Sequence, residues 1–308
     1  MFPKVVSQIT KYSFLAATGI AIGIGALSAG SARAFTINFD EGLAGVAGDG
    51  TLITDQYKQD YGVTFDSINN RTTDYGLVLY DSNCVGKSGW RGVSEDGFTN
   101  VCTGGDRDLA TGRGQYYHNN AWYDYDTEAQ GNLLILQENA DYFDPDDDLK
   151  GGEVSLQFNT VNDGNTFFEE GVTFEKFGFA DLDEAMIRNK KLSFTFEYAD
   201  SSRNPFIIDD SNYADYIEEL ILSVDWDGNI LDGDNSLREY TFKNDDGTFD
   251  GVKEVKVEYN NVSGAIAYFE YLESQPVEEI PVDIPEPGVT MALTAVVLGG
   301  VKLRRNAA

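Results

Sequence analysis

Clustered aspartates are the residues of this sequence best suited to chemistry. The stretch "DYFDPDDDLKGGE" carries four of them around Pro145, namely Asp144, Asp146, Asp147 and Asp148. "GGDRDLATG" carries Asp106 and Asp108 beside flexible glycines. Calcium takes about six to eight oxygen ligands and neutralises carboxylates that repel one another, so both stretches are candidate sites for a structural calcium. The alternative for each stretch is an acidic turn between two strands.

Aromatic residues gather in a second stretch, "QYYHNNAWYDYD", which shows no strand or helix period. Flat rings beside Asn and Asp suit stacking on sugar rings, with polar groups meeting the hydroxyls. The candidate stacking residues are Tyr116, Tyr117, Trp122, Tyr123 and Tyr125. The alternative is that these rings fold down as a small core over a sheet edge. Exposed rings would make the tryptophan fluorescence respond to polysaccharide.

Catalytic groups are hard to assemble from the remaining residues. His118 is the only histidine, which excludes sites built from several histidines, and no G-x-S-x-G elbow is present. Carboxylates are abundant, so a glycoside hydrolase stays open as an alternative. With 52 acidic residues, however, carboxylate pairs arise by chance. We expect a protein that is not an enzyme.

The charge is strongly one-sided. Residues 35–287 hold all 52 acidic residues but only 16 of the 22 basic ones, a net charge of −36. Such a surface repels nucleic acid and anionic lipid and favours cations. Disorder is the usual fate of so acidic a chain, but a hydrophobic content of 42% and an aromatic content of 13% are enough to build a core.

Short alternating segments predict strands along the whole of this acidic region. Eleven of them are separated by Gly, Asn and Asp turns: "FTINFD", "GVTFDS", "GLVLYDS", "NLLILQE", "EVSLQFN", "VTFEKFGFADLD", "KLSFTFEYA", "ELILSVDWD", "REYTFK", "EVKVEYN" and "AIAYFEYL". Only "NYADYIEELILS" is ambiguous, since its start could form one turn of helix before a strand. The pattern predicts an all-β fold, a two-sheet antiparallel β-sandwich of the jelly-roll kind.

Several of these segments resemble exported bacterial β-sandwich domains, in which "INFD" is followed by "YGVTF", "GGDRDL" and "GNLLI". The close, "VKVEYNNVSGAIAYFEYL", resembles the last strands of carbohydrate-binding jelly rolls. In those domains a calcium often ties the first strand to the last, which implies Asp40 and Glu41 as first-strand ligands. This sequence has Ala267 or Tyr268 where the last-strand aspartate is expected, so Asp40 could equally end a strand in solvent.

The N-terminus has the pattern of a secretory signal over residues 1–34. Lys4 and Lys11 precede an apolar run, and Ala32 and Ala34 form an A-x-A cleavage site. The signal is expected to form a helix, and the mature chain is expected to begin near Phe35. An uncleaved membrane helix is the alternative.

The C-terminus carries a short apolar segment. Residues 288–301 hold no charge, and as a helix they reach only about 21 Å, against about 30 Å for a hydrocarbon core. This length predicts a transient contact with the inner membrane, with the basic residues that follow on the cytoplasmic side. A permanent membrane anchor is the alternative.

Residues 285–308 resemble the PEP-CTERM sorting signal of Gram-negative bacteria. The resemblance rests on Pro285-Glu286-Pro287, the apolar segment, and a terminal cluster with Arg304 and Arg305. It implies recognition and cleavage by an exosortase-type membrane protease, in bacteria that make exopolysaccharide. The apolar segment departs from the pattern by its modest length and its Thr and Gly residues.

Cys84 and Cys102 are the only cysteines. In an exported protein an even pair most often forms a disulfide, which here would contribute about 3 kcal/mol by restricting the unfolded chain. Two thiols without nearby histidines make at best half a zinc site.

The expected organisation is a signal peptide (1–34), a β-sandwich (35–274), a linker (275–284) and a sorting signal (285–308). We expect an acidic protein of the cell surface or extracellular matrix with a structural or adhesive role. The alternatives are a carbohydrate-binding module of the exopolysaccharide matrix and a glycoside hydrolase. A structural calcium, where bound, would raise the melting temperature at millimolar concentration.

Overall fold

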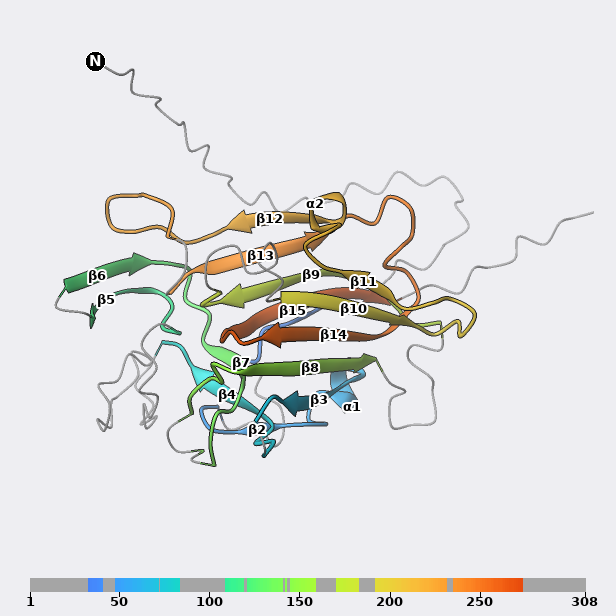
Figure 1. Ribbon diagram of the computed structural model, residues 1–308, viewed down its shortest axis with the longest axis horizontal. Coiled ribbons are helices and arrows are strands. Elements are labelled where there is room, and N and C mark those ends of the chain that lie inside the picture. The colour runs from blue at the N-terminus through green and yellow to red at the C-terminus, as the bar shows by residue number, and fades with distance from the viewer. Residues whose placement is uncertain are drawn as a thin grey trace, which may run out of the picture. The chain divides into compact units, whose positions relative to one another are not determined.

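The computed structural model describes residues 33–40, 48–71, 73–83, 109–118, 121–140, 142, 145–158, 170–182, 192–231 and 235–273, without the side chains of 114–123. Strands dominate this part of the chain, so the prediction of an all-β fold is confirmed there (Figure 1). The elements are β1 (Ala34–Ile37), β2 (Leu52–Ile53), α1 (Lys58–Tyr61), β3 (Val63–Asn69), β4 (Leu77–Asp81), β5 (Arg113–His118), β6 (Ala121–Asp126), β7 (Asn132–Leu136), β8 (Gly151–Phe158), β9 (Val172–Ala180), β10 (Leu192–Tyr198), β11 (Phe206–Ile208), α2 (Tyr213–Tyr216), β12 (Ile217–Ile221), β13 (Leu237–Phe242), β14 (Val252–Asn260) and β15 (Ala265–Glu273).

Each of the eleven predicted segments contains a strand. The ambiguous segment is confirmed in detail, since the single turn α2 leads directly into β12. Two short strands and one hairpin were not predicted. The short strands, β2 and β11, hold only two and three residues, too few to show an alternation. The hairpin is β5–β6.

All of the strand pairings within the described residues are antiparallel, and apart from the β5–β6 hairpin they fall into two sets. The first set runs β11–β10–β14–β8–β3. In the second set β15 pairs with β9, β1 and β7; β9 continues to β13 and β12, and β7 continues to β4 and β2. The two sets share one pairing, between Val172 of β9 and Val252 of β14.

The main core is aromatic and joins the two sets. Phe194 and Phe196 of β10 contact rings of the second set, with centroids 5.7 Å apart for Phe177–Phe194 and 6.0 Å for Phe174–Phe196. Phe242 of β13 lies 5.2 Å from Phe196. All five rings are buried. Burying these large aromatic side chains contributes apolar stabilisation that an acidic chain needs to fold.

A smaller second core covers the other face of β4 and β7. Leu77, Leu79, Leu134 and Leu136 belong to the main core, whereas their neighbours Val78, Tyr80, Leu133 and Ile135 belong to the second one. Because both faces are buried, these strands are continuous apolar runs in the sequence and do not alternate. Leu109 also lies in the second core, so the chain just before β5 packs against this face.

Candidate functional site

The backbone of the acidic stretch extends the β7 ladder. Asp147 forms a bridge with Gln137, just after β7. The amide of Asp148 donates to Leu136 O at 3.0 Å, and that of Glu138 donates to Asp146 O at 2.9 Å. Part of this predicted calcium stretch is therefore paired backbone. Asp144 lies outside the described residues.

The carboxylates of the stretch have separate partners. Asp147 Oδ2 accepts a hydrogen bond of 2.7 Å from the amide of Gly264, in the turn between β14 and β15. Asp148 Oδ1 accepts a bond of 2.9 Å from the amide of Lys150. Both aspartates are buried. Asp147 therefore satisfies a backbone N–H that would otherwise be buried without a partner, and Asp148 holds the turn that leads into β8.

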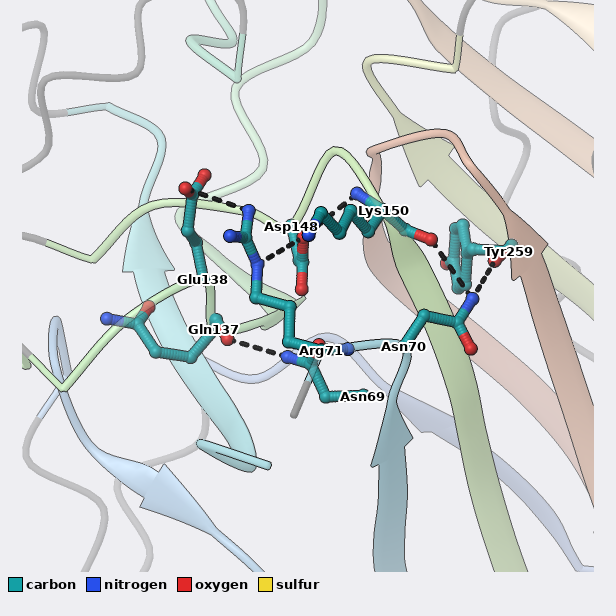
Figure 2. A network of polar contacts seen from close by, with 8 residues as sticks. All are labelled: Asn69, Asn70, Arg71, Gln137, Glu138, Asp148, Lys150 and Tyr259. Atoms are coloured by element: carbon teal, nitrogen blue, oxygen red, sulfur yellow. Dashed lines mark hydrogen bonds and ion pairs between the residues drawn. The ribbon is translucent and has the colours of Figure 1, made fainter. Parts of the chain in front are cut away.

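Arg71 is the cation beside Asp148, one of the aspartates that were predicted to bind calcium. Its Nε is 2.7 Å from Asp148 Oδ1, an ion pair without hydrogen-bond geometry, and its Nη2 is 2.8 Å from Glu138 Oε1 (Figure 2). Burial lowers the pKa of Arg71, but the two carboxylates outweigh it, so the pKa is raised overall. The guanidinium thus supplies the positive charge that neutralises the buried Asp148.

The two asparagines before Arg71 complete this network. Asn69 Nδ2 donates to Gln137 O at 2.8 Å, and Asn70 Nδ2 donates to Lys150 O at 3.0 Å (Figure 2). The network therefore joins the end of β3 to the segments after β7 and before β8. These contacts indicate a structural role for this part of the acidic stretch.

Asp40 holds the start of β7. Its Oδ1 accepts hydrogen bonds from Asn132 N at 2.9 Å and from Asn132 Nδ2 at 3.0 Å. Its side chain also lies where a Cβ on Gly131 would be, which explains a glycine with φ of 69° at that position. Strand β1 pairs with the last strand, β15, whereas the carboxylate of Asp40 hydrogen-bonds to the start of β7.

Within the part of the chain that the structure describes, no three His, Cys, Asp or Glu side chains converge to hold a metal ion. Several predicted site residues lie outside that part. They are Glu41, Asp106, Asp108, Cys84, Cys102, Ala32, Pro285, Glu286, Pro287, Arg304 and Arg305.

The aromatic stretch forms the β5–β6 hairpin, although its sequence shows no strand period. The backbone register pairs Tyr116 with Tyr123 and Tyr117 with Trp122, and the side chains of these four residues are outside the description. Tyr125 is buried with Ala110 and Leu231 packed around it. As a correction, Tyr125 is therefore not available to stack on a sugar, and the small-core alternative holds for this ring.

The outer face of β9, β13 and β15 carries a compact charged cluster. Lys176 Nζ lies 3.2 Å from Glu239 Oε2 and 3.4 Å from Glu270 Oε2, and Tyr268 OH donates to Glu239 Oε2 at 2.7 Å. Burial, with help from Glu239, raises the pKa of Tyr268. Because Lys176 lies between the two glutamates, their charges are largely neutralised, which suits cross-strand stabilisation.

Glu175 on β9 has no paired residue on β15, because it occupies a bulge between the Phe174–Tyr271 and Lys176–Glu270 pairs. Burial and the charge of Glu270 raise the pKa of Glu175, against the opposing effect of Lys176. Compared with the unfolded chain, the folded state therefore binds a proton at Glu175 more readily. At neutral pH the ionised Glu175 carboxylate lowers the free energy of unfolding.

Replacing Glu175 by glutamine is expected to raise the free energy of unfolding at pH 7 by up to about 0.5 kcal/mol, allowing for solvent screening. The gain should vanish as the pH falls below the ordinary carboxyl range, because both states of the wild type are then protonated at Glu175. Urea denaturation at pH 7 and pH 3 measures both values. Glu218→Gln, an exposed glutamate on β12, is the control; an equal gain there would contradict the assignment to the bulge.

No known protein family, curated protein or solved structure matches this chain. Among the described residues, no helix has the length and apolar character needed to cross a bilayer.

Proposed function

We propose that this chain is an exported, acidic protein of the cell surface or extracellular matrix of a Gram-negative bacterium, with a structural or adhesive role. Its C-terminal segment would be a PEP-CTERM signal that an exosortase-type membrane protease recognises and cleaves during a transient contact with the inner membrane. The role is non-catalytic. The three-part order of the tail, with Pro285-Glu286-Pro287 at its start, carries the proposal.

The two strand sets support a β-sandwich of the jelly-roll kind for residues 35–274. Ring contacts such as Phe177–Phe194 and Phe196–Phe242 join the sets, while one residue pair connects their ladders. Strand β10 alternates buried and half-buried residues along its length, as a strand with one face on a core does.

The N-terminal edge of this body lies next to the predicted signal cleavage site. Strand β1 begins at Ala34, and its pairing with β15 sets Ala34 opposite Leu272. Phe35 is buried and stacks on Tyr271, with centroids 5.0 Å apart, whereas Arg33 and Ala34 are exposed. Cleavage after Ala34 would therefore remove the exposed Arg33 and Ala34 and would leave the buried ring of Phe35 at the new N-terminus.

The intact mass of the protein recovered from the cell surface tests the proposal. We expect a chain that starts at Phe35 and lacks the residues after the Pro285-Glu286-Pro287 motif. Replacing Pro285 and Pro287 by alanine should retain the C-terminal residues and reduce the surface fraction, because the extended, accessible motif is lost. Pro281→Ala, in the linker just upstream, is the matched control.

Recovery of surface-located wild-type protein with Arg304 and Arg305 still attached would overturn the proposal. Efficient cleavage of the double alanine variant would show that the motif is not what the protease recognises.

A further inference from the structure

The loop between β12 and β13 presents an aromatic ring that the proposed function leaves without a role. Trp226 is 45% exposed at the tip of this loop, and Ile230 on the same loop is 69% exposed. Figure 1 shows the loop beside β6, and the bridge between Val224 and Asp126 joins the two. Large apolar side chains exposed on the same loop are typical of contact surfaces.

The indole of Trp226 is fixed in place before any ligand arrives. Its Nε1 donates to Tyr125 O at 3.2 Å, and its backbone N donates to Asp124 Oδ2 at 2.9 Å. The loop itself is braced by Asp225, which accepts two hydrogen bonds of 2.7 Å from Asn229. A ring that is already ordered loses little conformational entropy on binding, so less of the favourable contact free energy is offset.

Polar groups of both signs surround this ring. The guanidinium of Arg113 lies over it, with Cζ 5.3 Å from the ring centroid. Arg113 Nε is 3.7 Å from Asp126 Oδ2, and both side chains are well exposed, at 65% and 43%. An apolar platform with a fork of N–H donors and carboxylate acceptors at its rim matches a pyranose, whose C–H face is apolar and whose hydroxyls donate and accept.

The charge around the ring selects among such ligands. Arg113 is the one basic side chain that contacts the ring in the described residues, while Asp124, Asp126 and Asp225 hold negative charge on the adjoining strand and loop. Residues 35–287 as a whole carry a net charge of −36. This negative charge would repel phosphates and uronates, whereas an uncharged sugar would experience no electrostatic repulsion.

We propose that Trp226, with Arg113 and Asp126 at its rim, is a binding site for an uncharged polysaccharide. This inference deepens the proposed matrix role and rests on it only for the biological source of the sugar.

Affinity electrophoresis of the purified full chain tests the site, with dextran, laminarin and hydroxyethyl cellulose as uncharged probes and alginate as the acidic one. Retardation by at least one uncharged probe is expected, and Trp226→Ala should weaken it about tenfold or more. Tyr142→Ala is the matched control: that ring is 37% exposed and its OH donates to Tyr75 O, so binding should not change.

A second measurement does not depend on how well Trp226→Ala folds. The chain has three tryptophans, so replacing Trp90 and Trp122 by phenylalanine leaves Trp226 as the only indole. Its emission should shift to the blue when the binding polysaccharide is added. Retardation by alginate alone or by no probe, unchanged binding by Trp226→Ala, or no spectral shift would each overturn the site. None of these results depends on export or tail cleavage, which the mass measurement tests separately.

Discussion

Replacing Arg71 by methionine is expected to lower the free energy of unfolding by about 3–5 kcal/mol. The side chain of Asp148 is completely buried, and Arg71 is its ion-pair partner at 2.7 Å. Methionine keeps much of the volume and the aliphatic packing but removes the charge, so a carboxylate would stay buried without a cation. Urea denaturation followed by circular dichroism measures the change.

Two further variants isolate the charge effect. Arg71→Met combined with Asp148→Asn should recover most of the loss, because the uncharged amide retains an oxygen for the amide of Lys150. Arg113→Met removes the exposed ion pair with Asp126 and should change stability by at most about 1 kcal/mol. An Arg71→Met effect no larger than that of Arg113→Met would contradict the network's structural role.

The strands could be predicted because their local patterns are strong. Strand β10, "LSFTFEY", alternates along its whole length, and β7, "NLLIL", is a continuous apolar run bounded by turn residues. The β5–β6 hairpin escaped prediction because aromatic and polar residues occupy consecutive positions in it, which hides the period of two. Pairing partners were beyond reach, because residues as distant as Phe35 and Tyr271 meet only in the folded chain.

For the site residues, too, the sequence predicts what neighbouring residues share but not which distant residues they contact in the fold. The sequence placed Asp146, Asp147 and Asp148 together and indicated that their charge needs compensation. It could not show that Arg71, far away in the chain, supplies the positive charge for Asp148, or that Gly264 N is the partner of Asp147. Trp226 was overlooked because the sequence places it in the alternating segment "ELILSVDWD", which predicts a strand residue. Strand β12 ends at Ile221, and the exposure of Trp226 depends on how its loop packs against β6.

Replacing Phe194 by alanine is expected to lower the free energy of unfolding by about 3–5 kcal/mol, the usual range for emptying a buried aromatic site. Phe194 is completely buried on β10. Its ring stacks on Phe177 at 5.7 Å and meets Phe242 edge-on at 5.4 Å, so it contacts two strands of the other set. Urea denaturation measures the loss, and an unchanged slope of the unfolding free energy with urea would show that the compactness of both states is retained.

Ile207→Ala on the neighbouring strand β11 is the control. Ile207 pairs with Thr195, the residue after Phe194, but its side chain is 53% exposed. It should change stability by no more than about 0.5 kcal/mol. A double-mutant cycle with Phe177→Leu and Phe194→Leu should give a coupling of about 0.5–1.5 kcal/mol, since only these two stacked rings are altered. A coupling near zero, with a small effect of Phe194→Ala, would mean that the two strand sets do not share one core. The β-sandwich proposal would then fail, because a sandwich is stable only when the inner faces of both sheets bury each other.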